Sequence, residues 1–246
     1  MTSAAPRIVL VTPVWKDSTR LAVFGASLAT ALAAARLPVR WVIADDGSGP
    51  EEIQRLRALR DEFAAVYPEV ELHGAAAHRG KGSVVREAWA LHPGAEWLAF
   101  VDADGSAPPA DVLGLLTRAR AEDSSAIGMR IRTAATAIVE TPWRGLAHRA
   151  FPLAVRVLLG LRCEDPQCGA KVLKASDYRR IEPRLVEAGL AFDSELLAHL
   201  RGEGCTWLEV PINWAEKPGG KVRPLRHAWG MLAALWRVRR RLGRRS

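Results

Sequence analysis

The chain has 246 residues, enough for one large α/β domain or two small ones. With 49% hydrophobic and 25% charged residues, its composition is that of an ordinary soluble globular protein. The formal charge of +8 comes from residues 221–246, which hold nine Lys or Arg and no acid, so the rest of the chain is nearly neutral. The chain is therefore not basic throughout. Its charge distribution indicates that one end contacts an anionic surface.

Cysteine usage and hydropathy exclude two further classes. Cys163, Cys168 and Cys205 lack metal-ligand spacing, and this odd number favours reduced thiols in a cytosolic protein. Leu21–Ala35 is the longest uncharged stretch, and its 15 residues are too few to span a bilayer. We therefore expect a cytoplasmic protein with no signal peptide and no transmembrane helix.

Strand-like and helix-like segments alternate along the first half of the chain. Such alternation is typical of a mostly parallel sheet with right-handed crossovers, in which the carboxyl ends of the strands share one edge. The predicted strands cover 7–11, 39–44, 70–73, 97–101 and 126–128, and the predicted helices cover 19–35, 51–66, 84–91 and 109–121.

The second half of the chain is less regular. Its predicted elements are an irregular basic segment at 130–149, helices at 151–161, after Lys171 and from Phe192, and a strand over 207–214. Two nucleotide-binding motifs are absent from the sequence. No Gly-x-Gly-x-x-Gly follows the first strand, and Gly80-Lys81 lacks the earlier glycine of a Walker A loop.

Asp102 and Asp104 are the most informative residues in the sequence. They follow the apolar run Trp97–Val101, at the position where open α/β sheets bind ligands. Two carboxylates separated by one residue can face one hard cation, and Mg²⁺ and Mn²⁺ prefer oxygen ligands. The alternative is a solvated turn, because Asp and Gly are common in turns. We predict a metal site with both carboxylates as ligands.

Five further motifs accompany Asp102-Ala103-Asp104-Gly105 in a definite order. They are Asp45-Asp46-Gly47-Ser48, Arg79-Gly80-Lys81-Gly82, Asp165-Pro166-Gln167-Cys168-Gly169-Ala170-Lys171, Phe192-Asp193-Ser194-Glu195-Leu196-Leu197 and Glu209-Val210-Pro211-Ile212-Asn213-Trp214. The set resembles family 2 glycosyltransferases of the GT-A fold, and most the polyprenyl- or dolichyl-phosphate glucosyltransferase type. The resemblance covers about residues 7–225.

This resemblance implies an α/β GT-A domain over residues 1–224, with one Rossmann-like, mostly parallel sheet flanked by helices, and a basic amphipathic helix over 225–246. It implies an inverting hexosyltransferase that uses Mg²⁺ or Mn²⁺. The expected donor is a nucleotide sugar, UDP-glucose first, and the expected acceptor is a polyprenyl or dolichyl phosphate. GDP-mannose and a non-lipid hydroxyl acceptor are the alternatives within the same fold.

The implied donor-binding residues are Pro13, Trp15, Asp46, Lys81, Asp102, Gln167 and Lys171. Asp46 would accept hydrogen bonds from the nucleoside, Trp15 would stack on the base, and Lys81 would approach the nucleotide from its glycine loop. A turn aspartate and a solvated loop lysine are the alternatives for Asp46 and Lys81. Asp104 is the expected direct ligand of a cation that neutralises charge on the leaving diphosphate.

Arg130 resembles the family arginine that could clamp an acceptor phosphate, and Arg144 and Arg149 either assist it or remain loop charges. A lipid phosphate is already an anion and needs positioning more than deprotonation. Asp193 is the candidate base for a neutral hydroxyl acceptor, or else the N-cap of the helix that follows. The implied catalytic residues are therefore Asp104, Asp193 and Arg130.

Three departures from the family pattern concern selectivity. Val14-Trp15-Lys16-Asp17 stands where the family often has Tyr-Asn-Glu, His78 replaces an Asn, and Met129 replaces a Ser. They leave the donor base and the acceptor open. Cys168 is expected to be a small packed residue and not a nucleophile.

The tail combines apolar residues at helical spacing with arginines at its far end. The apolar residues are Leu225, Trp229, Leu232, Leu235 and Trp236. A basic amphipathic helix with tryptophans is typical of an interfacial anchor, so we expect peripheral contact with the inner face of the membrane. The alternatives are a helix docked on the core and a nucleic-acid-binding tail. No nucleic acid is expected, because both acidic motifs of the enzyme are retained.

Overall fold

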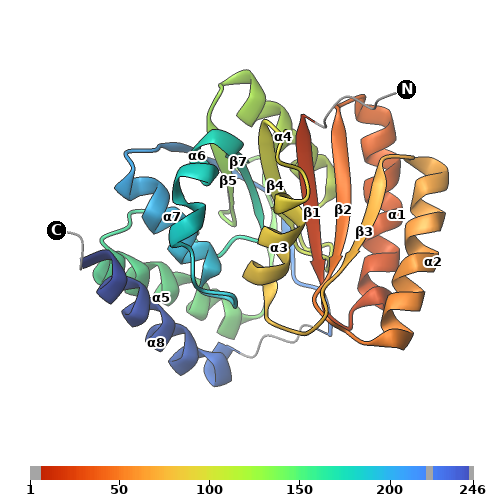
Figure 1. Ribbon diagram of the computed structural model, residues 1–246. Helices are drawn as coiled ribbons and strands as arrows, with labels where there is room; N and C mark the ends of the chain where they lie inside the picture. Colours follow the sequence, from red (N-terminus) through yellow and green to blue (C-terminus); the bar gives the residue numbers. More distant parts are fainter. Residues whose placement is uncertain (1–6, 220–223, 244–246) are drawn as a thin grey trace.

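A seven-stranded sheet lies between two layers of helices in the computed structural model, which describes residues 7–219 and 224–243 and leaves aside the side chains of 142–150 and 224–228 (Figure 1). The strand order is β3-β2-β1-β4-β7-β5-β8, and β7 alone among them is antiparallel to its neighbours. The strands are β1 (Ile8–Val14), β2 (Val39–Asp45), β3 (Val70–Gly74), β4 (Trp97–Val101), β5 (Ser125–Met129), β7 (Ala170–Lys174) and β8 (Trp207–Pro211).

Both faces of the sheet are covered, which explains why the strands are almost continuously apolar. Along β1, for example, Ile8 and Leu10 enter one hydrophobic core, and Val9 and Val11 enter the other. One face packs on α1 (Ser18–Ala35), α2 (Pro50–Val66) and α4 (Pro109–Ala121), and the other on α3 (Lys81–Ala90), α6 (Ala175–Ile181) and α7 (Phe192–Gly202). α5 (Pro142–Leu159) and α8 (Pro224–Leu242) pack against each other, and α8 also packs against α7 (Figure 1).

The predicted α/β architecture is confirmed, but β7 was missed. The sequence analysis placed only a helix after Lys171, and that helix is α6, which the short 3₁₀ turn Glu182–Arg184 follows. The apolar run Ala170–Lys174 before it is a buried central strand, paired with β4 and β5. A five-residue run with lysines at its second and last positions has no clear period of its own, so its neighbours determine its structure.

Two boundaries in the second half were also wrong. The predicted strand 207–214 ends at Pro211, and Trp214–Ala215 (β9) instead pairs with Ile138–Val139 (β6) in a small second sheet. α5 begins at Pro142, inside the segment 130–149 that was predicted to be irregular, and continues through Pro152. Proline is favoured in the first turn of a helix, whereas within a helix it removes one hydrogen bond, which this helix tolerates.

Among the described helices, only α1 has the length and apolar composition that could span a membrane. In the fold it packs against α2 and α4, with Leu21, Leu28 and Leu32 buried in the core. The two exposed tryptophans of the tail lie elsewhere, on α8.

Candidate active site

Neighbouring strand ends bring the acidic motifs to one edge of the sheet. β1, β2 and β4 are adjacent and parallel, so their carboxyl ends lie together. Asp46 follows β2, and Asp102 and Asp104 follow β4, while Lys81 opens α3 on the same side. We call these four residues, with Asp193 of α7, the strand-end site.

Asp46 joins the end of β2 to the glycine loop before α3. Its Oδ1 accepts the backbone N–H of Arg79 at 2.9 Å, and its Oδ2 accepts that of Gly80 at 2.8 Å. The Nδ1 atom of His78 lies 2.8 Å from the same Oδ2, and its ring stacks on Trp15 with ring centres 4.1 Å apart. Asp46 is buried, so it is not a solvated turn residue.

Lys81 lies between two carboxylates. Its Nζ is 2.8 Å from Oδ1 of Asp102, 3.4 Å from Oδ2 of Asp193 and 4.5 Å from the ring centre of Phe100. Burial alone would lower the pKa of Lys81, but the two carboxylates raise it above its ordinary value. Lys81 is therefore a charged ammonium group held in place, not a solvated loop lysine.

Asp193 is shared by two lysines, Lys171, which is fully buried, and Lys81, which is partly buried. Its Oδ1 lies 2.7 Å from Nζ of Lys171, which also donates to the backbone carbonyl of Cys168 at 2.7 Å. Burial alone would raise the pKa of Asp193, but the ammonium groups of Lys171 and Lys81 hold it below its ordinary value. The N-cap of α7 is Ala191, so Asp193 does not cap the helix. It is an ionised carboxylate with a weak affinity for protons.

Asp102 and Asp104 occupy a crowded turn. A Cβ atom added to Gly169 would meet Oδ2 of Asp102 at 2.1 Å, so this glycine makes room for the carboxylate. Oδ1 of Asp104 accepts the backbone N–H of Ser106 at 2.9 Å, and its Oδ2 lies 3.6 Å from Nη1 of Arg20. Arg20 is a contact that sequence reasoning missed, because it lies in α1, far from the motif.

The two carboxylates fit a Mg²⁺ or Mn²⁺ ion that is completed by a substrate. Among the residues whose side chains are described, no group of three or more His, Cys, Asp or Glu could hold a metal ion. Magnesium is commonly bound by one or two carboxylates together with substrate phosphates and water. Burial raises the pKa of Asp102 against the opposing effect of Lys81, and a bound cation would favour its ionised form.

The structure also locates the other residues that the resemblance implies for donor binding. Nε2 of Gln167 donates to Oγ of Ser194 at 3.1 Å and so links the turn before β7 to α7. Pro13 lies in β1 beside Ala44 of β2. Cys168 is fully buried, and burial raises the pKa of its thiol to about 12, so it is packed and not a thiolate nucleophile.

Arg130 is held within the protein by a carboxylate that sequence reasoning gave no role. Its Nε and Nη2 each donate to Asp165 at 2.6 Å, and its guanidinium lies 5.0 Å from the ring centre of Trp214. Burial alone would raise the pKa of Asp165, but Arg130 holds it below its ordinary value. Arg130 and Asp165 are 35 residues apart in the sequence, and no local pattern indicates that they pair. Arg144 and Arg149 lie in α5, where side chains are outside the described residues.

Residues 185–191 connect the strand-end site to the end of the chain. The carbonyl of Ala188 accepts the backbone N–H of Ser83 at 3.2 Å, in the first turn of α3. A Cβ atom added to Gly82 would meet Phe192 at 2.5 Å, so α3 and α7 approach closely where Lys81 and Asp193 meet.

Two buried glutamates anchor α8 to this segment. Glu195 is 0% exposed, and its Oε2 accepts the backbone N–H of residues 186 and 187 at 2.9 and 2.7 Å. Its Oε1 lies 2.9 Å from Nη2 of Arg241, and Glu187 pairs with Arg237 and Arg241 at 2.9 and 2.7 Å. Part of the basic tail is therefore neutralised inside the molecule.

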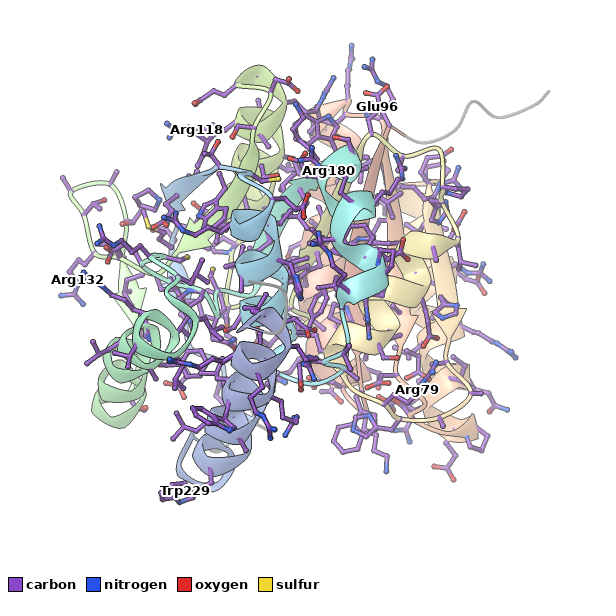
Figure 2. All side chains as sticks on the ribbon, turned by 60° about the vertical axis from the view of Figure 1, so that its left-hand side comes forward. Arg79, Glu96, Arg118, Arg132, Arg180 and Trp229 are labelled. Carbon is purple, nitrogen blue, oxygen red and sulfur yellow. The ribbon has the colours of Figure 1, made fainter. Side chains whose placement is uncertain are left out.

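The outer surfaces of α5 and α8 expose large apolar side chains. Trp229 is 80% exposed and Trp236 is 53% exposed. Figure 2 shows Trp229 and Arg79 near the same end of the molecule, and Glu96, which precedes β4, near the opposite end. We call this surface the α5–α8 face; its exposed apolar residues are Leu153, Val157, Trp229, Leu232 and Trp236.

Known proteins share both the sequence motifs and the fold. Residues 11–177 match Glycosyl transferase family 2. Dolichyl-phosphate beta-glucosyltransferase of Saccharomyces cerevisiae is 29% identical over 199 residues, which cover 74% of this chain and 59% of the yeast protein. Polyprenol monophosphomannose synthase of Mycolicibacterium smegmatis is 29% identical over 215 residues, which cover 84% of this chain and 79% of that protein. The chain thus spans about three fifths of the yeast relative.

Solved structures of glycosyltransferases have the same fold. Glucosyl-3-phosphoglycerate synthase of Mycobacterium tuberculosis in complex with UDP matches with a TM-score of 0.64 at 15% identity, over 97% of this chain and 80% of that one. A mannosyltransferase from Pyrobaculum calidifontis in complex with GDP-Man and Mn²⁺ matches with a TM-score of 0.60 at 18% identity, over 94% and 62%. The GT-A fold prediction is confirmed. With a family match over more than half of its length, the chain belongs to glycosyl transferase family 2.

Proposed function

We propose that this enzyme transfers a hexose, glucose first, from a nucleotide-diphosphate sugar to a polyprenyl phosphate with inversion. The observation that carries the proposal is the line of charges Asp102–Lys81–Asp193–Lys171 at the carboxyl edge of the sheet. It places fixed cations and carboxylates beside the acidic pair, as binding of an anionic, metal-bridged diphosphate requires. The names of the yeast and mycobacterial relatives support the lipid phosphate acceptor.

In this mechanism, Asp102 and Asp104 would hold a divalent cation, which when bound supplies a Lewis acid for the leaving diphosphate. Lys81 would face the diphosphate from the first turn of α3 with its ammonium group already oriented. Lys171 and Asp193 would hold that orientation, because both are buried and paired. The charges would then need little rearrangement as the bond between the sugar and the diphosphate breaks.

The state of Asp193 favours an anionic acceptor. A neutral hydroxyl would need a base, and the ammonium groups that lower the pKa of Asp193 make it a weak one. A phosphate monoester already carries negative charge and can attack the anomeric carbon directly. We propose that Arg130, Arg144 and Arg149 position that phosphate, with Asp165 setting the orientation of the first.

The α5–α8 face would bring the enzyme to its lipid acceptor. Its tryptophans and aliphatic side chains suit the interfacial region of a bilayer, and Trp229 lies toward the end of the molecule that carries Arg79 (Figure 2). We propose a peripheral association with the cytoplasmic face of the membrane. Arg237 and Arg241 pair with glutamates, and the other basic residues of 221–246 would add electrostatic attraction to an anionic leaflet.

The test is a transfer assay with purified protein, polyprenyl phosphate in detergent micelles and either UDP-glucose or GDP-mannose, with Mn²⁺ or chelator. We expect metal-dependent glucosyl transfer to the lipid phosphate. Transfer from GDP-mannose alone would show that GDP-mannose is the donor. GDP-mannose is the second candidate because of the names of the mycobacterial relative and the Pyrobaculum structure. Transfer only to soluble hydroxyl acceptors would overturn the lipid assignment.

A further inference from the structure

His78 makes two contacts that together resemble those of a bound nucleobase. Its planar ring stacks on Trp15 with ring centres 4.1 Å apart and an interplanar angle of 17°. Nδ1 of the ring lies 2.8 Å from Oδ2 of Asp46. A ring stacked on an aromatic ring, with a ring nitrogen close to a carboxylate, is the arrangement expected of the donor's base at these same residues.

A base cannot take both contacts while His78 keeps them. The two rings are already in contact, so no third ring fits between them. We propose that His78 is a placeholder for the nucleobase, which the donor must displace, and that it thereby sets the affinity and the base selectivity of the enzyme. This inference rests on the proposed function, since it takes the donor to be a nucleotide sugar.

The surrounding backbone is fixed, so the exchange needs only the side chain to turn. A Cβ atom added to Gly47 would meet the backbone of residues 77 and 78 at 2.4 Å, which shows how closely the two loops pack. The backbone N–H groups of Arg79 and Gly80 are also held by Asp46. The side chain of His78 is itself 47% exposed, so it can rotate into solvent without moving the loop.

The exchange also favours one class of base. Oδ1 of Asp46 already accepts from Arg79, and Oδ2 from Gly80, and both bonds remain when His78 leaves. Departure of the ring uncovers Oδ2 on the side where Nδ1 now lies. A single ring N–H, as in uracil, needs one acceptor there, whereas the adjacent N–H and NH₂ groups of guanine need two. The placeholder therefore favours a uridine nucleotide.

The test is calorimetry of UDP and of GDP binding in the presence of Mn²⁺, with the full chain and three variants. His78→Ala removes both contacts, and we expect it to bind UDP about tenfold more tightly than the unchanged protein, because a stacking contact and a close contact of the ring nitrogen with Asp46 no longer have to be broken. His78→Asn, which cannot stack as a ring, should fall between the two. His92→Ala, at the opposite edge of the sheet just before β4, is the matched control and should bind unchanged.

The outcomes separate the two proposals. Equal or weaker UDP binding by both His78 variants would overturn the placeholder while leaving the nucleotide-sugar donor intact. Tighter binding of GDP than of UDP by the unchanged protein would overturn the selectivity. Absence of UDP and GDP binding in every protein would overturn the proposed function itself.

A second measurement follows the ring directly. If UDP expels His78, acylation of this histidine by diethyl pyrocarbonate, mapped by mass spectrometry, should become faster when UDP and Mn²⁺ are bound. Protection of His78 by UDP would instead place the ring beneath the ligand and overturn the placeholder.

Discussion

Charged and apolar side chains are arranged in opposite ways at the strand-end site and on the α5–α8 face. At the strand-end site, Lys81 and Lys171 contact carboxylates, and the network is buried against Phe100. On the α5–α8 face, tryptophans and aliphatic side chains meet solvent, while Arg237 and Arg241 pair with glutamates of the protein itself. The charges of one region are paired within the protein, and the other region exposes apolar surface that would gain stability if it were covered.

This difference shows where each kind of selectivity lies. A preorganised polar site depends on individual atoms, so single substitutions in it should have large effects. An apolar face depends on summed area, so single substitutions there should have small ones. The predictions below test this contrast, from the largest expected effect to the smallest.

Asp104→Ala should abolish transfer. It removes a carboxylate from the proposed cation site, and kcat should fall at least about a thousandfold, because the Lewis acid for the leaving group is lost. The measurement is release of nucleoside diphosphate with Mn²⁺ present. Asp123→Ala is the control, since Asp123 pairs only with Lys174 at the other edge of the sheet, 2.7 Å away. Activity of Asp104→Ala within tenfold of the unchanged enzyme would rule out this assignment.

Asp193→Asn should destabilise the fold by about 3 kcal/mol at neutral pH, because it leaves two buried ammonium groups without their shared carboxylate. The folded-state pKa of Asp193 lies below its ordinary value of 3.8, so its stabilising effect is present above that pH and is lost as the pH falls through the folded value. In urea unfolding, the gap between the two proteins should therefore close below about pH 4. A gap that stays constant on acidification would contradict this account.

Arg130→Lys should raise KM for the lipid phosphate about tenfold, because lysine cannot make the bidentate contacts of a guanidinium. KM for the nucleotide sugar should not change. Arg118→Lys is a matched control on the exposed surface of α4, where Arg118 pairs with Glu122 at 2.8 Å (Figure 2). If both KM values of Arg130→Lys rise together, the arginine only supports Asp165 and the fold.

The Trp229→Ala, Trp236→Ala double variant should weaken binding to phosphatidylglycerol vesicles about fivefold to tenfold, through lost apolar contact. Val23→Ala is the control, because the side chain of Val23 is exposed on the surface of α1. Added salt should also weaken vesicle binding, since two of the nine basic residues in 221–246 pair with glutamates and seven more carry charge. Binding that falls with salt but not with the double substitution would show that charge, and not the tryptophans, drives the association. Both effects are measured by co-sedimentation.

The first half of the fold follows from sequence more fully than the second. β1, β2 and β4 are apolar runs next to helices, so their local pattern and tertiary environment agree. β7 and the start of α5 differ because their structure depends on partners distant in the chain. The motif residues lie at one edge of the sheet because they follow parallel strands, whose carboxyl ends lie together.

Pairings across the site were harder to predict. Arg130 was expected to hold a phosphate, and its bond to Asp165 depends on the turn before β7 folding back on β5. Asp193 was left as either a base or a cap, and the two lysines that surround it come from α3 and β7. These contacts join segments that are far apart in the sequence, and no sequence periodicity indicates that they meet.

The anchoring of α8 has a consequence for protein engineering. A shortened chain that ended before Arg237, made to remove the adhesive helix, would also remove the cations that face Glu187 and Glu195. A fully buried carboxylate without a cation must either take up a proton or loosen its surroundings. Residues 185–191 would loosen first, together with the turn of α3 that presents Lys81. Replacing exposed tryptophans on α8 is therefore a better route to a less adhesive enzyme than cutting the helix away.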